Sequence, residues 1–441
     1  MKHKLLFIGL LACSLFSCKD KGEIRIVTLS MPSSFQEEAD HLPSISVWGN
    51  GVDNAEFVFS GRNADGQLEY RSKQALSNEI TGNVRIVWPY SAETEYDGEV
   101  VTLRQNDVQT PSKQALYTGG NGIHEGEKAV IPMRMMTARI QLTFSNLPKD
   151  EQIVSATLRL TAKEGYSSDL FYQEATYNFA TNLLKPNTSI QRSAFTTYDA
   201  DNQSGTTTLY LGVFPESYKD CNLSAEIITS GGNGHNTLHV FPFEGKTFAK
   251  SQTYTYDIDF GTTHETGAAY ITDARGVVSL GLPIEIDGTT FAPVNLGYDE
   301  LQSPFGLLYK TGDFTGMPYH EENPISDYCN DKVSATTTLV PTGWRLPSVA
   351  EMQKLVSAVR SEGSICGNTF GWCFSGKLYL PATGCIEEDG TSTARLQEGY
   401  YLIDDRQNGA AAQGTVLHIT DSGTQVEAAK GGAYAIRLVK E

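Results

Sequence analysis

The chain has 441 residues, and its 52 acidic and 34 basic side chains give a formal net charge of −18 at pH 7. A surface this acidic repels phosphate backbones, which argues against a nucleic-acid-binding protein. Hydrophobic residues make up 40% of the chain, with 21 Tyr and 19 Phe. The composition therefore excludes a disordered chain and allows two or three domains with cores of their own.

The N-terminus has the pattern of a secretory signal peptide. A basic start, with Lys2 and Lys4, precedes the apolar residues 5–16, which are too few for a membrane-spanning helix of roughly 20 residues. The run Leu15-Phe16-Ser17-Cys18 resembles the lipobox of bacterial lipoproteins. We expect residues 1–17 to be removed and Cys18 to carry acyl chains such as palmitate, anchoring the protein at the surface of the outer membrane. Cys13 is an alternative that shortens the apolar core, and a plain secretion signal is another.

Five cysteines remain beyond the signal segment. An odd number leaves at least one thiol free or paired between chains, and export permits disulfides. Cys366 with Cys373 or Cys385 is the favoured pair, and the remaining two are Cys221 and Cys329. No spacing is of the CxxC kind, so the sequence predicts no zinc site.

The first half of the chain is a succession of short alternating segments. In residues 138–144, Ile140, Leu142 and Phe144 fall on one face and polar residues on the other, which is typical of a half-buried antiparallel strand. Residues 154–162 repeat the pattern, and further strands are predicted at 84–88, 207–213, 223–228, 237–243 and 253–260. No helical pattern occurs before residue 270, which favours a β-sandwich region.

The pattern changes at residues 261–267, which we take as a domain boundary. Ser348 and Glu351 have the spacing of a capping box, followed by one apolar stripe formed by Met352, Leu355, Val356 and Val359. The pattern predicts a helix that starts after Ser348 and ends at Gly363. Strands are predicted around it at 378–380, 399–403 and 433–439, so residues 268–441 are predicted to form an α+β domain.

Four segments of the first region carry a resemblance through their order and spacing: residues 88–91, 135–140, 208–215 and 248–257. With them, residues 24–262 resemble the fimbrillin or Mfa-like family, the fimbrial lipoproteins of Bacteroidales. The resemblance implies tandem β-sandwich subdomains within 18–267, with a boundary near 145–150. It also implies assembly with other fimbrial subunits by insertion of a donated strand.

A second resemblance rests on residues 291–297, 306–312, 343–348, 378–384 and 434–439. In this order they resemble the Fibrobacter major-paralogous domain, a relative of C-type-lectin-like and formylglycine-generating-enzyme-like folds. The likeness covers residues 284–441 and implies a lectin-like α+β domain. Residues 339–343 lack the Cys-Pro that the family carries before Gly-Trp-Arg, so its disulfides are not carried over.

The sequence holds no recognisable catalytic motif. His124-Glu125 and His264-Glu265 lack the second histidine of a zinc-protease helix, and neither a nucleophile elbow nor a phosphate-binding loop is present. The C-terminal cysteines do not match the paired active-site cysteines of formylglycine-generating relatives. We therefore expect a protein that is not an enzyme, with no catalytic residue, no cofactor and no bound metal.

Several side chains are candidates for ligand binding. Trp372, Tyr400 and Tyr401 could present an aromatic face to a sugar ring or a peptide, although such side chains are also common in cores. An acidic loop could bind calcium or simply be solvated, and contains Asp313, Glu321, Glu322, Asp327 and Asp331. Trp344 and Arg345, placed just before the helix, are interpreted as structural.

Together these features predict a non-enzymatic surface lipoprotein, a minor or tip fimbrial subunit whose C-terminal domain adheres to glycans or to host or bacterial surface proteins. No spare strand follows residues 433–439, so the subunit is expected to accept a donated strand at the fimbrium tip. Cleavage after Arg62 would release the first strand, residues 24–29, with Arg25 as the alternative site. The alternative function is a stand-alone surface lipoprotein that captures such ligands without polymerising.

Overall fold

The computed structural model describes residues 23–32, 35, 42–109, 115–128, 130–163, 166–168, 171–188, 191–197, 208–232, 234–268, 271–273, 275–320, 336–337, 340–365, 369–404 and 414–441. The chain divides into two compact units. The first unit contains the residues up to Phe35, Leu42–Glu93 and Thr118–Met133, and the second contains the rest. Cys18, Cys329 and Cys366 lie outside the described residues, as does most of the acidic loop.

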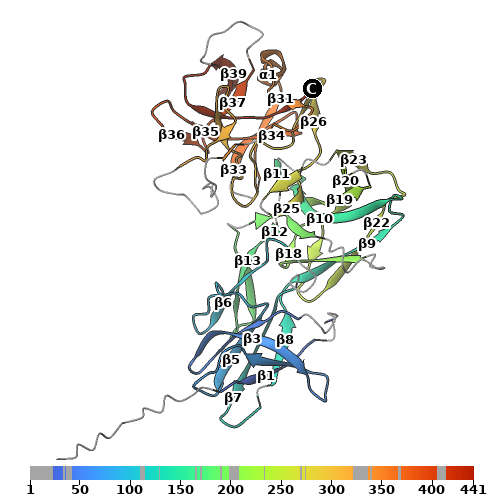
Figure 1. Ribbon diagram of the computed structural model, residues 1–441, viewed down its shortest axis with the longest axis vertical. Helices are drawn as coiled ribbons and strands as arrows, with labels where there is room; N and C mark the ends of the chain where they lie inside the picture. Colours follow the sequence, from blue (N-terminus) through green and yellow to red (C-terminus); the bar gives the residue numbers. More distant parts are fainter. Residues whose placement is uncertain are drawn as a thin grey trace, which may run out of the picture. The chain divides into compact units, whose positions relative to one another are not determined.

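The first unit is built on a closed barrel of strands (Figure 1). Around the barrel the order is β1 (Ile26–Ser30), β4 (Leu68–Ser72), β3 (Val52–Arg62), β2 (Ile45–Gly49), β5 (Gly82–Trp88), β7 (Tyr117–Ile123) and β8 (Val130–Met135). β1 closes it, because it pairs antiparallel with β4 and parallel with β8. The alternation of the strands fills the interior with buried apolar side chains, among them Val27, Val47, Phe57 and Tyr70.

The second unit begins with two sheets packed face to face. One sheet has the order β17 (Thr208–Val213), β9 (Ala138–Ser145) and β22 (Thr253–Asp259). The opposite sheet contains β23 (Glu265–Ala268), β20 (Asn236–Glu244), β19 (Cys221–Gly231) and β10 (Glu151–Ala162), with β16 (Ala194–Thr197) also paired to β10. The predicted stripe of Ile140, Leu142 and Phe144 joins Leu158 and Ile227 in the shared core, which confirms the sandwich arrangement.

The β10 sheet continues into the C-terminal region. β11 (Tyr166–Ser168) pairs antiparallel with β10 and parallel with β32 (Arg360–Ile365), which leads on to β33 (Thr369–Phe374) and β34 (Leu378–Pro381). One ladder of hydrogen bonds therefore runs from the sandwich to strands nearly 200 residues later in the chain.

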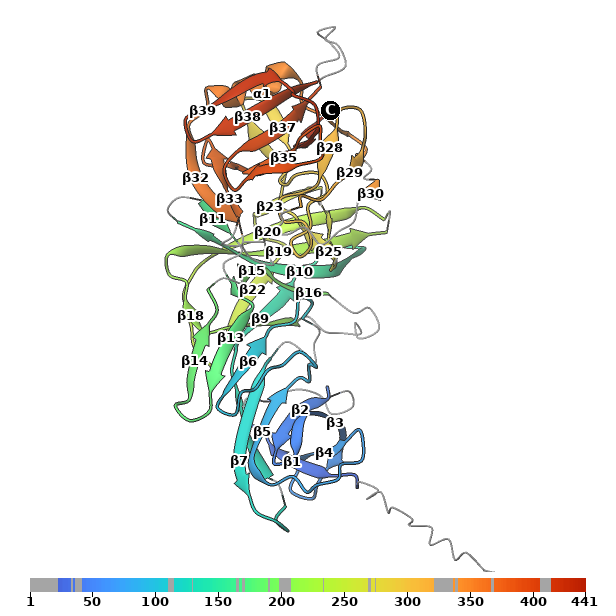
Figure 2. The same ribbon diagram turned by 90° about the vertical axis from the view of Figure 1, so that its left-hand side faces the viewer.

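A second sheet dominates the C-terminal region, seen in Figure 2 beside α1 (Val349–Val356). Its order is β28 (Leu308–Lys310), β40 (Ala433–Ala435), β35 (Thr383–Ile386), β37 (Gly399–Ile403), β38 (Thr415–Thr420) and β39 (Gly423–Ala428), with β36 (Ser392–Arg395) beside β35. A four-stranded sheet of β26 (Ile284–Ile286), β27 (Thr289–Phe291), β41 (Val439–Lys440) and β31 (Trp344–Arg345) completes the α+β region. The prediction of a mainly β protein is confirmed, and within the described ranges α1, late in the chain, is the single α-helix.

The remaining strands are short. β14 (Leu183–Pro186), β13 (Glu174–Asn178) and β6 (Val100–Arg104) form a three-stranded sheet. Two-stranded pairs are β12 (Phe171–Tyr172) with β15 (Gln191–Arg192), β18 (Glu216–Ser217) with β21 (Thr247–Phe248), β24 (Ile271–Asp273) with β25 (Gly276–Ser279), and β29 (Thr315–Gly316) with β30 (Thr336–Thr337). Among the described residues, no helix is long and apolar enough to cross a membrane.

The helix starts where the sequence predicts and ends early. Ser348 and Glu351 form the expected capping box, but α1 stops at Val356 and the predicted end at Gly363 is wrong. Val359, assigned to the apolar stripe, is 82% exposed. The residues from Arg360 onward pair with β33 instead, so sheet hydrogen bonding prevails over the helical pattern.

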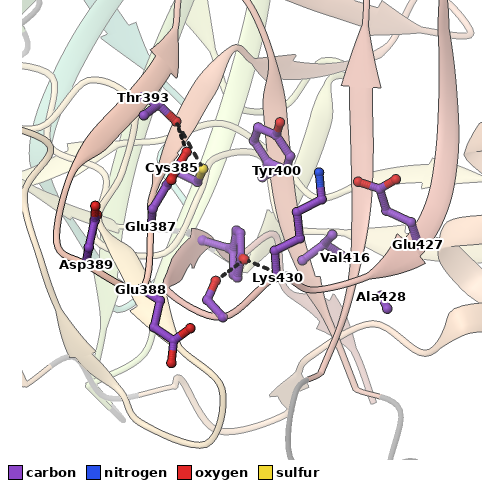
Figure 3. A pocket seen from close by; sticks show the side chains of 12 residues that line it. Cys385, Glu387, Glu388, Asp389, Thr393, Tyr400, Val416, Glu427, Ala428 and Lys430 are labelled. Atoms are coloured by element: carbon purple, nitrogen blue, oxygen red, sulfur yellow. Dashed lines mark hydrogen bonds between the residues drawn. The ribbon is translucent and has the colours of Figure 1, made fainter.

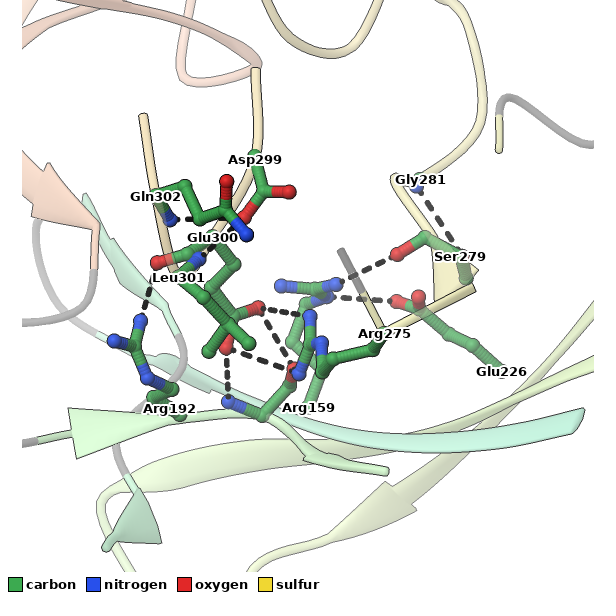
Figure 4. Close-up of polar contacts among 11 residues, drawn as sticks. Arg159, Arg192, Glu226, Arg275, Ser279, Gly281, Asp299, Glu300, Leu301 and Gln302 are labelled. Atoms are coloured by element: carbon green, nitrogen blue, oxygen red, sulfur yellow. Dashed lines mark hydrogen bonds and ion pairs between the residues drawn. The ribbon is translucent and has the colours of Figure 1, made fainter. Parts of the chain in front are cut away.

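A buried polar cluster ties the sandwich to the C-terminal region (Figure 4). We call Arg192, Ser193, Arg275 and Glu300 the Glu300 network. Arg275 Nη2 lies 3.0 Å from Glu300 Oε2, Ser193 Oγ donates to the same oxygen at 2.8 Å, and Arg192 donates to the Glu300 carbonyl. Burial opposes ionisation of Glu300, but Arg275 and Arg192 outweigh it, so the pKa of Glu300 is lowered.

Candidate functional site

A cavity of about 360 Å³ opens on the C-terminal sheet. This volume lies in the range of small-ligand pockets. The wall comes from β35, β36, β37, β38, β39 and β40 and from the residues that follow β35 and β39. The lining residues, most of them labelled in Figure 3, are Cys385, Glu387, Glu388, Asp389, Thr393, Tyr400, Val416, Glu427, Ala428, Lys430, Gly431 and Tyr434.

Two tyrosines supply the aromatic part of the wall. Tyr400 is half-buried, and its ring stacks on His418 at 4.2 Å with 13° between the planes. Its hydroxyl donates to Glu398, and burial followed by that carboxylate raises the pKa of Tyr400. Tyr434 lies with its ring centre 6.1 Å from that of Tyr400, and its hydroxyl accepts from the Lys430 amide at 3.1 Å. The stacking on His418 and the hydrogen bond to Glu398 therefore fix the orientation of the Tyr400 ring.

The charged side chains of the wall are mostly acidic. Glu387, Glu388, Asp389 and Glu427 face one cation, Lys430. Asp389 accepts the Thr391 amide at 2.9 Å, and this hydrogen bond lowers the pKa of Asp389. The pocket thus combines an excess of carboxylates, one ammonium group and an aromatic face, a set of groups suited to a polar ligand that also carries apolar surface.

His418 lies behind the wall, between two carboxylates. Its Nε2 is 3.0 Å from Glu398 Oε2, and its Nδ1 is 3.0 Å from Glu427 Oε1. The hydrogen bond of Tyr400, opposed by partial burial and followed by that of His418, lowers the pKa of Glu398. These contacts fix the side chains that flank the cavity.

Cys385 contributes a buried thiol to the pocket. Its Sγ lies 3.6 Å from Thr393 Oγ1, and burial raises the pKa of Cys385. Cys221 and Cys373 are also buried free thiols, and burial raises the pKa of Cys373 to about 11. Such thiols remain protonated at neutral pH and are poor nucleophiles. Cys366, the predicted disulfide partner, lies outside the described residues.

The three predicted ligand-binding aromatics lie in different places. Trp372 is 2% exposed and Tyr401 is fully buried, both within the hydrophobic core, and Tyr401 donates to the Pro381 carbonyl at 2.6 Å. Tyr400 alone lines the cavity. Its neighbour points the other way because successive side chains of a strand alternate.

Most of the cavity wall could not be recognised from the sequence. Glu427, Lys430 and Tyr434 come from separate segments that only the sheet brings together, and His418 carries no motif. The one available signal was the polar His418 inside the apolar alternation of residues 415–420.

The remaining candidate residues that the structure describes make contacts that stabilise the local fold. Arg345 donates to both oxygens of Glu351 at 2.7 and 2.8 Å and so fixes the start of α1. Asp313 accepts the Thr315 amide at 2.8 Å, while Glu321, Glu322, Asp327 and Asp331 lie outside the described residues. Within the described ranges, no group of three or more acidic, histidine or cysteine side chains is arranged to hold a metal ion.

Arg62 is the last residue of β3 and donates to the Gly66 carbonyl at 3.1 Å across the following turn. Cleavage after it would separate β1, β2 and β3 from the rest of the barrel chain. Departure of the cleaved segment would deprive β4 of both of its partners, β1 and β3. Arg25, the alternative, stands just before β1, where it pairs with Glu23 at 3.0 Å.

Comparison with known proteins gives only distant similarities. No family model and no curated protein matches the chain. Among solved structures, a candidate cell adhesion protein from Bacteroides ovatus is 12% identical with a TM-score of 0.38, over 56% of this chain and 96% of that one. A fimbrial protein from Bacteroides vulgatus is 13% identical with a TM-score of 0.29, over 55% and 99%. The tip fimbrial protein Mfa3 from Porphyromonas gingivalis is 9% identical with a TM-score of 0.26, over 56% and 98%.

Proposed function

We propose that this protein is a non-enzymatic binding protein of the bacterial surface, and that the C-terminal region, residues 268–441, holds the ligand in the cavity beside Tyr400. The observation that carries the proposal is the cavity itself, about 360 Å³ in volume, with an aromatic ring fixed from behind by His418 and Glu398. Because this ring is already fixed, little conformational entropy is lost when a ligand binds to it.

The chemistry of the pocket supports binding rather than catalysis. Its only thiol, that of Cys385, is kept protonated by burial. The acidic and aromatic wall suits an amino sugar or a lysine or arginine side chain of a surface protein, since these combine a positive charge with apolar surface.

Attachment to the cell rests on the sequence alone. The signal segment and the lipobox support a lipid anchor at Cys18, which would hold the binding region at the outer-membrane surface. The family resemblance of residues 24–262 supports membership of a fimbrium as a minor or tip subunit that joins other subunits through the barrel.

A stand-alone receptor is the second candidate, and one observation favours it. β1 occupies the place between β4 and β8 and closes the barrel, so a donated strand has no open groove until β1 leaves. Purification of fimbriae followed by immunodetection separates the two: a fimbrial subunit stays with the fimbriae in detergent, whereas a stand-alone receptor is extracted with the membrane.

Binding is tested with the full chain on an array of glycans and surface proteins. Tyr400→Ala removes the aromatic face, and Lys430→Ala changes an exposed residue that does not support the core. Tyr210→Ala, a half-buried tyrosine of β17, is the matched control. Signals lost in both pocket variants and kept in the control support the proposal, whereas signals unchanged in both contradict it.

A further inference from the structure

Two charged side chains of the cavity wall are not engaged by the protein itself. Within the part of the chain that the structure describes, neither the carboxylate of Glu388 nor the ammonium group of Lys430 forms a hydrogen bond or an ion pair. Each of the other carboxylates of the wall accepts a hydrogen bond from a neighbouring residue, at 2.8 Å for Glu427, 2.9 Å for Asp389 and 3.4 Å for Glu387. Glu388 and Lys430 are therefore the two charges that the pocket leaves for a ligand.

The backbone fixes where these two charges stand. Gly431 and Gly432 have φ angles of +85° and +87°, in the left-handed region that favours glycine. A Cβ atom on Gly432 would collide with the Ile386 carbonyl oxygen, and one on Gly431 would lie 3.4 Å from Glu388 Oε2. The turn that carries Lys430 therefore lies directly against the turn that carries Glu388.

The two side chains nevertheless point apart. Figure 3 shows the side chain of Lys430 extending toward Tyr400, whereas the carboxylate of Glu388 points away from it. Apolar surface in the same cavity comes from Tyr400, Val416 and Tyr434. The wall thus offers a negative group, a positive group and an apolar face, with the two charges separated.

We propose that the cavity binds a zwitterion whose two charges are separated by an apolar chain, namely the carboxyl-terminal lysine of a surface polypeptide. This inference rests on the pocket function proposed above. The lysine ammonium group pairs with Glu388, and the terminal carboxylate pairs with Lys430. The alkyl chain between them covers the ring of Tyr400, as the apolar stems of long charged side chains commonly do.

The last residue of a polypeptide can bring both charges to the site. A lysine inside a chain, like an amino sugar, carries a positive charge without a carboxylate and leaves Lys430 without a partner. In a free amino acid of the ordinary kind, the α-ammonium and carboxylate groups share one carbon atom, so they cannot reach two groups that point apart. Each exposed ion pair contributes little by itself, so strong discrimination requires that both pairs form.

The test uses three probes that share one alkyl chain and differ in charge. Nα-acetyl-lysine carries both charges, its methylamide keeps only the ammonium group, and Nα-acetyl-norleucine keeps only the carboxylate. Each is titrated into the full chain at neutral pH, and its dissociation constant is measured by ligand-observed NMR. Nα-acetyl-lysine is expected to bind several-fold tighter than either of the other two. This advantage should shrink at high salt, because salt screens exposed ion pairs.

Matched variants assign each charge to a residue. Glu388→Gln should abolish the advantage of Nα-acetyl-lysine over Nα-acetyl-norleucine, because the ammonium group loses its partner. Lys430→Met should abolish the advantage over the methylamide, because the carboxylate loses its partner. Glu125→Gln and Lys128→Met, which change exposed residues of the first unit, are the controls and should change neither.

The outcomes separate this inference from the pocket function. If the three probes bind equally, or if the advantage of Nα-acetyl-lysine survives both pocket variants, the zwitterion assignment is wrong and the pocket function stands. If no probe binds, the assignment is equally wrong. The pocket function itself fails only if the signals on the array of glycans and surface proteins are unchanged in Tyr400→Ala.

Discussion

Arg275 and Glu300 form an ion pair whose side chains are each only 1% exposed, with Nη2 of the arginine 3.0 Å from Oε2 of the glutamate. Ser193, between β15 and the sandwich strand β16, donates to the same carboxylate at 2.8 Å. Through Ser193, this buried ion pair of the C-terminal region is linked to the sandwich by charges that water does not screen.

Glu300→Gln should strongly destabilise the chain. The change leaves Arg275 buried without its counter-charge, which typically costs about 3–5 kcal/mol. The free energy of unfolding in urea measures the effect. Glu244→Gln, which breaks the exposed pair of Lys163 and Glu244, serves as control and should cost less than about 1 kcal/mol. Equal losses in the two variants would show that the Glu300 network is not energetically special.

Glu351→Gln should lower the free energy of unfolding at neutral pH, and lower it much less in acid. Arg345, opposed by partial burial and supported by Ser348, lowers the pKa of Glu351 from 4.5 to about 2. A depressed native pKa gives stability that is complete above pH 4.5 and is lost as the pH falls toward 2. The helix cap contributes on the order of 1 kcal/mol. Urea unfolding of both proteins at pH 7 and pH 3 checks this, and a difference that is the same at both pH values contradicts it.

The strands were the predictable part of this protein. Alternation over residues 138–144 and 154–162 depends on one buried face, and β9 and β10 follow it. The helix end was not predictable, because the sheet partner of Arg360 lies outside the local pattern. Neither was the Glu300 network, since Ser193 and Glu300 are 107 positions apart and no local pattern connects them. The pocket could not be predicted for the same reason, because the pairing of strands, and not the spacing of residues in the sequence, brings Tyr400, Glu427 and Lys430 together.

Cys18→Ser should release the protein from the membrane fraction. The predicted acyl chains depend on the thiol of Cys18, and each buried CH₂ contributes roughly 0.8 kcal/mol to anchoring. Membrane fractionation and palmitate labelling of cells check the change. Cys13→Ser is the matched control and should behave as the unchanged protein. A Cys18→Ser variant that still labels with palmitate would place the lipid elsewhere.

Arg62→Ala should trap a lipidated precursor if the chain is processed for polymerisation. Cleavage after Arg62 frees β1 to β3 and leaves β4 without partners, so the cut form should persist only where another subunit supplies strands. N-terminal sequencing of the fimbria-associated form decides the matter. A start at Asn63 is expected, with Arg25→Ala as a control that leaves it unchanged. A start at Cys18 would instead indicate an uncleaved, membrane-held receptor.

The central claim is that a ligand binds beside Tyr400. The most direct measurement is a crystal structure of the full chain with the ligand selected on the array, paired with titration calorimetry of Tyr400→Ala and Tyr400→Phe. The account predicts ligand density in the cavity between Tyr400, Tyr434 and Lys430, at least about tenfold weaker binding for Tyr400→Ala, and a smaller loss for Tyr400→Phe, which keeps the ring. Density at another surface, with unchanged affinity in both variants, would contradict it.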